Sequence, residues 1–227
     1  MTGWEGIDRA MVVAPHPDDE VLGCGGTIAR LAAQGVRVDV VIATKGRVAD
    51  FGAERVAAVE AEAGAAHARL GVAETHWLDF PAARLDGEPH AAMNQALGAL
   101  VAALRPQLLF IPFVGDVHLD HQLVFLSSLV AARPRGTDSP AAIYAYETLS
   151  ETNWNAPYLS PAFAPNIFVD ISDFLAAKLD AFRLFRSQVQ PFPHERSPEA
   201  VEALARLRGA TVCRHAAEAF VLVREVL

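Results

Sequence analysis

The fold is decided near the start of the chain, by the stretch Ala10-Met11-Val12-Val13-Ala14-Pro15-His16-Pro17-Asp18-Asp19-Glu20. Its apolar first half predicts a buried strand, which the two prolines bring to an end. Its second half places one imidazole and three carboxylates within five residues. Nitrogen and oxygen ligands of these kinds suit zinc and other divalent first-row metals. The sequence therefore predicts a metal-binding loop at the carboxyl end of the first strand.

Beyond this stretch, strand-like and helix-like segments alternate. We expect strands at 10–13, 36–43, 75–78, 108–112 and 141–146, and helices at 21–34, 53–70, 91–104 and 117–132. Segment 133–140 has the composition of a surface linker. The alternation predicts an α/β fold with a Rossmann-like, doubly wound, mostly parallel sheet and helices on both faces. Gly23-Cys24-Gly25-Gly26 lacks the spacing of a nucleotide-binding loop and is expected to allow close helix packing.

The second polar segment follows the fourth predicted strand and reads His118-Leu119-Asp120-His121. In the common doubly wound order the first and fourth strands are neighbours, and ligands bind where their carboxyl ends meet. We therefore expect His16, Asp19 and His121 to bind one metal ion, with zinc as the cofactor. Three protein ligands leave a fourth position for water, as in catalytic rather than structural zinc sites.

Three other residues of these segments have predicted catalytic roles. Asp18 points away from the ligands and is free to act as general base on the metal-bound water. His118 and His121 are three residues apart and face the same crevice, where a protonated His118 would stabilise an oxyanion or the leaving group. Asp120 is expected to hold one of the rings. The simpler alternative for either segment alone is helix capping or a favourable charge at a helix start.

Composition limits the class of protein. The chain has 227 residues, 52% of them hydrophobic, which is ample for one α/β domain. We expect a single domain over 1–227, with an α/β core at 1–146 and a part at 147–227 that completes the pocket. The formal net charge of −8 argues against a nucleic-acid partner. Two distant cysteines, and no apolar run near the ~20 residues needed to cross a bilayer, predict a cytoplasmic protein without a membrane span.

The two polar segments together resemble those of the LmbE / PIG-L family of zinc-dependent deacetylases. The likeness includes the glycine-rich helix start after the first segment and continues at Lys178 and Ala217-Glu218-Ala219-Phe220. The resemblance implies hydrolysis of an N-acetyl group on an N-acetylglucosamine-type amino sugar, a small-molecule substrate. Relatives often form dimers or hexamers, so the resemblance also implies a homo-oligomer.

The chain departs from the family pattern at positions near the sugar pocket. Many relatives carry Arg-x-x-Glu on the second helix, whereas this chain has Val59 and Glu62. Arg55, one turn earlier on the same face, is expected to take the place of the arginine. Where relatives tend to read Phe-Pro-Asp-Gly, this chain reads Phe80-Pro81-Ala82-Ala83. These changes make a plain N-acetylglucosamine monosaccharide a less expected substrate.

Further substrate contacts are predicted around these segments and in the last third of the chain. The predicted substrate-binding residues are Lys45, Arg47, Arg55, Glu147 and Trp154. The proline-containing loop 187–197 is expected to cover the site or to contact another subunit. Two alternatives stay open: an amidase or esterase that acts on another acyl conjugate, and a catalytically silent relative that binds metal or sugar.

Overall fold

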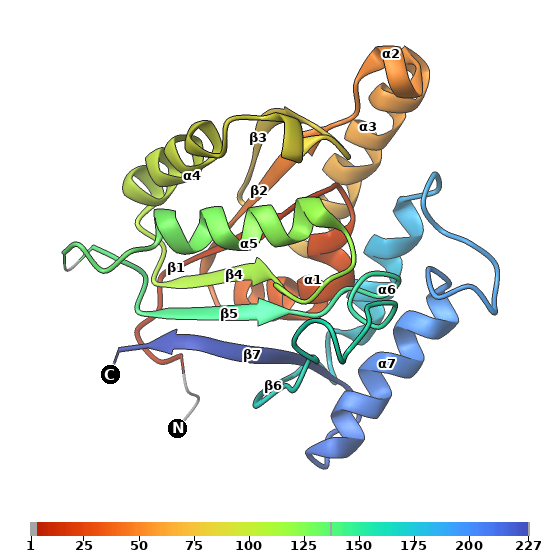
Figure 1. The fold of residues 1–227 in the computed structure, drawn as a ribbon. Helices are drawn as coiled ribbons and strands as arrows, with labels where there is room; N and C mark the ends of the chain where they lie inside the picture. Colours follow the sequence, from red (N-terminus) through yellow and green to blue (C-terminus); the bar gives the residue numbers. More distant parts are fainter. Residues whose placement is uncertain (1–3, 137, 227) are drawn as a thin grey trace.

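The computed structural model describes residues 4–136 and 138–226, whose strands form one sheet in the order β3-β2-β1-β4-β5-β7-β6 (Figure 1). The strands are β1 (Arg9–Ala14), β2 (Arg37–Lys45), β3 (Glu74–Pro81), β4 (Leu108–Pro112), β5 (Ala142–Tyr146), β6 (Ile167–Asp170) and β7 (Ala217–Glu225). Neighbours among β1 to β5 pair in parallel, whereas β7 runs antiparallel to β5 and β6. The predicted mostly parallel, doubly wound sheet is confirmed, and so is the pairing of the first and fourth strands.

Helices cover both faces of this sheet (Figure 1). They are α1 (Asp19–Ala33), α2 (Val48–Phe51), α3 (Ala53–Leu70), the 3-10 turn η1 (Leu85–Gly87), α4 (His90–Leu104), α5 (Leu119–Ala131), α6 (Leu175–Leu184) and α7 (Pro198–Thr211). On one face α4 packs against α5, and on the other α6 packs against α1 and α3. The helix α7 lies beside β7 and α6.

The central strand β1 is buried from both sides. Val12 packs into the core under α1, α3 and α6, and Met11 and Val13 pack into the core under α4 and α5. All three side chains are at most 1% exposed. Burial on both faces explains the unbroken apolar run in the sequence and contributes about 2 kcal/mol per side chain. The strand thereby fixes where the chain enters the polar loop that follows.

The helices after the two polar segments begin earlier or later than the patterns predict. Helix α1 begins at Asp19 rather than Val21, because the carbonyl of Asp18 already accepts the amide of Leu22 at 2.9 Å. Helix α5 begins at Leu119 rather than 117, because Nδ1 of His118 accepts the amide of Asp120 at 3.1 Å. Both polar segments therefore lie at helix amino ends. The sequence patterns did not assign α2, β6, α6, α7 and β7.

The glycines of α1 allow the close packing that the sequence predicts. A Cβ on Gly23 would lie 2.2 Å from the ring of Tyr146, and a Cβ on Gly26 would lie 2.7 Å from Ile171. The hydroxyl of Tyr146 donates to the carbonyl of Val13 at 2.9 Å. This contact joins α1, β5 and β1 immediately below the polar loop.

A buried ion pair ties two carboxyl-terminal elements to α1. Lys178 of α6 pairs with Glu218 of β7 and donates to the carbonyl of Leu22 at 2.7 Å. The carboxylate of Glu218 accepts the amides of Gly26 at 2.8 Å and Thr27 at 2.7 Å. Since a buried charge is tolerated only when it is paired and hydrogen-bonded, this network fixes α1 against α6 and β7.

The two cysteines are far apart along the chain, and the described helices can be compared with the length of a membrane span. Cys24 is buried in α1, Cys213 is exposed, and neither forms a disulfide. No helix among the described residues combines the length and the apolar character needed to span a bilayer.

Candidate active site

The two polar segments meet at the carboxyl ends of β1 and β4, as the doubly wound order predicts. Potential ligand atoms of His16, Asp19 and His121 all lie within 4.8 Å of one another. Oδ2 of Asp19 is 3.4 Å from Nδ1 of His16 and 3.2 Å from Nε2 of His121. The structure thus brings together the three predicted ligands, although their binding to a metal stays a prediction.

The atoms of this cluster fit a divalent cation. Oδ1 of Asp19 and Nε2 of His121 are buried and have no hydrogen-bond partner among the described residues. Nε2 is close to Oδ2 of Asp19 but is not aligned for a hydrogen bond with it. Buried polar atoms left without partners are costly, at about 1–3 kcal/mol each. A cation bound between the three side chains would satisfy both atoms.

A carboxylate lies at one ring nitrogen of each histidine that is predicted to bind metal. Nε2 of His16 is 2.9 Å from Oδ2 of Asp120, and Nδ1 of His121 is 2.8 Å from Oδ2 of Asp116. These contacts fix the ring orientations and leave Nδ1 of His16 and Nε2 of His121 for the metal. Asp120 is therefore in contact with the ring of His16, which is the position that its predicted role needs. Sequence reasoning missed the same contact for Asp116, two residues before His118.

The histidine pKa values reflect these carboxylates. Burial opposes the charge on His16, but hydrogen bonds to Asp120 and Asp19 outweigh it and raise its pKa to about 9. Burial likewise opposes the charge on His121, and the carboxylates of Asp19 and Asp116 raise its pKa well above the usual value. Without metal, both rings are therefore protonated at neutral pH. A cation would replace these protons.

Asp18 faces a pocket beside the ligand cluster. Its side chain is 1% exposed, and Oδ2 lies 2.6 Å from Nη1 of Arg196. Burial raises the pKa of Asp18 to about 8, and the positive charge of Arg196 opposes this shift. Arg196 also donates to the hydroxyl of Ser150 at 2.9 Å and lies 3.3 Å from the amide oxygen of Gln188. Sequence reasoning gave Arg196 no role of its own, only a place in loop 187–197.

His118 also faces the pocket and contacts neither predicted ligand through a hydrogen bond. Because Nδ1 accepts the amide of Asp120, the proton of the ring is on Nε2, which is free to donate. Burial lowers the pKa of His118, with the charge of His16 adding to the effect. The lowered pKa favours a neutral ring, whereas the spacing predicts a protonated one, and the catalytic role of His118 stays a prediction. A neutral ring still offers an Nε2–H donor.

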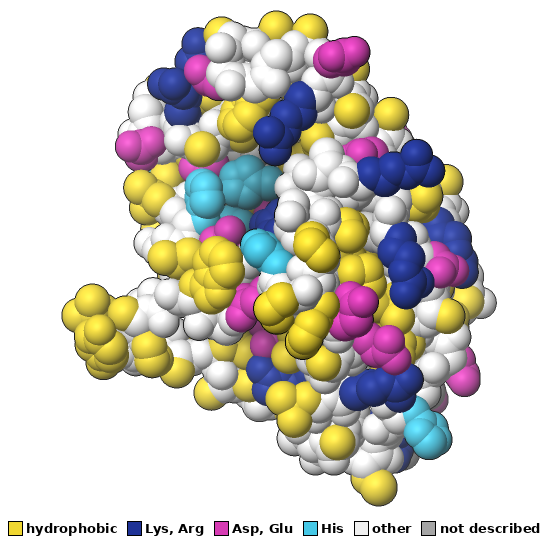
Figure 2. All heavy atoms as spheres, turned by 90° about the vertical axis from the view of Figure 1, so that its right-hand side faces the viewer, with side chains coloured by type: hydrophobic (Ala, Val, Ile, Leu, Met, Phe, Trp, Pro, Cys, Tyr) yellow, Lys and Arg dark blue, Asp and Glu magenta, His cyan; other side chains and the backbone are white. Residues whose placement is uncertain are grey.

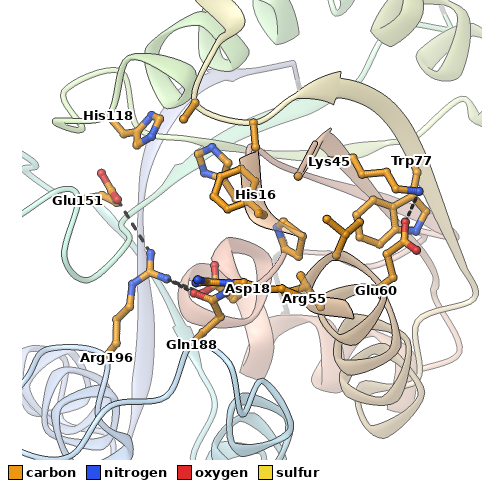
Figure 3. A pocket seen from close by; sticks show the side chains of 17 residues that line it. His16, Asp18, Lys45, Arg55, Glu60, Trp77, His118, Glu151, Gln188 and Arg196 are labelled. Carbon is orange, nitrogen blue, oxygen red and sulfur yellow. Dashed lines mark hydrogen bonds and ion pairs between the residues drawn. The ribbon is translucent and has the colours of Figure 1, made fainter. Parts of the chain in front are cut away.

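The pocket has a volume of about 270 Å³ and opens on the face shown in Figure 2, where histidine side chains lie in a hollow. Figure 3 places His16 and Asp18 in its middle. Arg196, Glu151 and Gln188 lie on one side of Asp18, and Lys45, Glu60 and Trp77 lie on the other. The pocket is thus open to a small molecule directly above the ligand cluster.

The predicted substrate-binding residues divide between two environments. Lys45 and Arg55 line the pocket. Arg47, Glu147 and Trp154 do not: Arg47 lies 3.5 Å from Asp50, Glu147 accepts two hydrogen bonds from Arg208, and Trp154 is 56% exposed. The structure brings to the pocket Glu151, Gln188 and Arg196, which come from irregular segments without a periodic signal.

The fold and the site together define an α/β protein with a candidate metal centre at the switch point of its sheet. Its sequence matches the family described as PIG-L: GlcNAc-PI de-N-acetylase over residues 11–132. This range is more than half of the chain and includes both polar segments. The chain belongs to the PIG-L family, as the sequence motifs predict.

Individual relatives extend the match beyond that range. The chain is 28% identical over 186 residues to an uncharacterized deacetylase of Escherichia coli (strain K12), which covers 78% of this chain and 90% of that protein. It is 27% identical over 199 residues to diacetylchitobiose deacetylase of Thermococcus kodakarensis, with 83% and 72% covered. A crystal structure of a conserved protein from Thermus thermophilus superposes with a TM-score of 0.79 and 30% identity, over 97% of this chain and 96% of that one.

Proposed function

We propose that the protein is a metal-dependent hydrolase that removes an N-acetyl group from an amino sugar. The observation that carries the proposal is the pair of unpaired buried atoms, Oδ1 of Asp19 and Nε2 of His121, beside the pocket-facing carboxylate of Asp18. The family and the named deacetylases among the relatives support the same reaction. Zinc is the metal that we expect, since imidazole and carboxylate ligands suit it.

His16, Asp19 and His121 would hold the metal, which supplies Lewis acidity toward an amide carbonyl and makes a water easier to deprotonate. Asp18 accepts the proton of the attacking water as general base. His118 donates Nε2–H to the oxygen that becomes negative, and the proton that Asp18 accepted passes to the departing amine as the C–N bond breaks. Asp116 and Asp120 keep the ligand rings in place. Lys45 and Arg55 are the predicted substrate contacts that line the pocket.

The test is acetate release from a panel of N-acetylated amino sugars by metal-loaded protein. We expect turnover by the wild type, loss of turnover on chelation with recovery on adding zinc, and a decrease of about 10²–10⁴-fold in Asp18→Asn. Asp173→Asn is a matched control, because Asp173 is exposed and lies outside the pocket. Unchanged turnover in Asp18→Asn would reject the general base. Metal and sugar binding without turnover by the wild type would favour a silent relative instead.

A further inference from the structure

The pocket has two chemically different ends, with Asp18 between them (Figure 3). One end presents the polar side chains of Glu151, Gln188 and Arg196. The other is lined by apolar side chains from α2, α3, β3 and the turn after it: Phe51, Val56, Val59, Trp77, Ala82 and Ala83. Any molecule that reaches Asp18 and extends in both directions therefore contacts two unlike surfaces.

Two of the charged side chains near the apolar end, Lys45 and Glu60, are paired with each other. Nζ of Lys45 forms an ion pair with Glu60 and lies 4.0 Å from Asp79. Arg55 is exposed and lines the pocket close to Asp18 (Figure 3). A hydroxyl placed against Val59 or Ala82 would lose hydrogen bonds to water that these apolar side chains cannot replace. An apolar group in the same place has no hydrogen bonds to water to lose, so its burial is favourable.

The apolar surface continues outside the pocket along α2. Phe51 is 41% exposed and Val48 is 58% exposed. The two residues are three apart on one helix, so their side chains lie on the same side. In Figure 1, α2 stands at the far end of α3, beyond the edge of the sheet. The wall therefore extends toward solvent and is not limited to the depth of the pocket.

The polar end is suited to hydroxyl groups. Oε2 of Glu151 is buried and has no hydrogen-bond partner among the described residues. The other carboxylate oxygen lies 4.0 Å from Nη2 of Arg196. A hydroxyl of a bound molecule would supply the missing donor. Gln188 adds an amide that both donates and accepts.

We propose that the substrate is an amino sugar that bears an apolar aglycone, an aryl or alkyl group, and that this group binds the apolar wall formed by Phe51, Val56, Val59 and Trp77. The sugar hydroxyls then face Glu151 and Gln188, and the acetamide lies over the ligand cluster. This inference rests on the proposed function, since it assigns the two ends of the same site to the two parts of one substrate. It identifies the wall as the element that determines specificity.

The test compares the methyl, octyl and para-nitrophenyl glycosides of N-acetylglucosamine. In the wild type, kcat/KM for the octyl and para-nitrophenyl compounds should exceed that for the methyl compound by at least about tenfold. Phe51→Ala and Val59→Gln should reduce this ratio. Leu207→Ala is the control, because Leu207 is an apolar residue of α7 that is 62% exposed and lies outside the pocket, so the ratio should stay as in the wild type.

Calorimetric binding of the three deacetylated glycosides provides a readout that does not depend on turnover. Tighter binding of the octyl and para-nitrophenyl compounds, weakened in Val59→Gln, supports the inference. Equal affinities for all three in the wild type would overturn it, whatever the catalytic result. Selective binding without acetate release would instead reject the proposed function and leave the apolar wall as a binding site.

Discussion

Asp18 is held in a backbone conformation that residues other than glycine seldom adopt, with φ of 117° and ψ of −26°. Such a conformation costs about 1–3 kcal/mol and persists only where its surroundings impose it. Here the ion pair with Arg196 and a 3.1 Å hydrogen bond from the Asp18 amide to Glu20 impose it. The strained backbone turns the carboxylate into the pocket, while the side chain of the next residue, Asp19, faces His16 and His121.

Arg196→Gln tests how far the guanidinium limits the rise in the pKa of Asp18. Burial raises the pKa of Asp18 and the guanidinium opposes the rise, so removing the charge should raise that pKa further. A general base acts only when deprotonated, so the acidic limb of the pH profile of kcat/KM should move to higher pH. Activity on that limb should fall about tenfold for each unit of displacement. Arg196→Lys, which keeps the charge, should restore part of the activity; an acidic limb that stays in place in Arg196→Gln would contradict this role.

Zinc binding should release about two protons at pH 7, because His16 and His121 are protonated in the metal-free protein and must be neutral to bind metal. The pKa of His16 is about 9 and that of His121 is raised. Affinity should therefore rise as pH increases toward 9. Calorimetry in two buffers of different ionisation enthalpy measures the release. His215→Gln, at an exposed residue outside the pocket, should behave like the wild type, and identical heats in both buffers would count against protonated ligands.

At the level of single residues, the sequence predicts those whose position follows from topology. The proximity of His16, Asp19 and His121 could be predicted, because each follows a strand that ends at the switch point. Arg196 could not, because nothing in a proline-containing loop indicates which way it folds back. Glu147 is the reverse case. Its polar side chain was predicted to bind substrate, but it does not line the pocket, and both of its carboxylate oxygens accept hydrogen bonds from Arg208.

Close packing of α1 can be tested with glycine substitutions. Gly23→Ala places a methyl group 2.2 Å from the ring of Tyr146, which is fully buried and cannot easily move. We expect a loss of about 1–3 kcal/mol in the free energy of unfolding, against a gain in helix propensity of about 1 kcal/mol or less. Urea denaturation of the metal-loaded protein measures the change.

Gly64→Ala in α3 and Gly98→Ala in α4 are the matched controls. A Cβ at either position meets no atom within 4 Å. The same substitution should there be neutral or stabilise the protein by up to about 1 kcal/mol. Equal effects at Gly23 and Gly98 would show that α1 does not depend on this contact.

The elements that the sequence predicts well are those with a strong apolar signal. The strands β1 and β4 read as unbroken apolar runs because both faces are buried. By contrast, α2 is a single turn, and β6 and β7 follow segments without regular alternation. Their pairing depends on long-range contacts: β7 lies between β5 and β6, and the order of these strands in the sheet is not their order in the chain.

For the whole molecule, the alternation of strands and helices was sufficient to predict the parallel part of the sheet, β1 to β5, and to suggest the position of the site. It was not sufficient for the pocket walls. Glu151, Gln188 and Arg196 come from the part after Tyr146, in the segments between β5 and β6 and between α6 and α7. That this part serves to complete a substrate pocket stays a prediction.

Anomalous diffraction at the absorption edge of the bound metal, from crystals of the full chain, tests the central claim most directly. We predict one strong peak at about 2.0–2.2 Å from ligand atoms of His16, Asp19 and His121. Asp39, Glu74 and His76 form another group close enough to hold an ion, with Arg37 already bound to both carboxylates. A peak at that second group alone, or none at the switch point in metal-loaded crystals, would contradict the account.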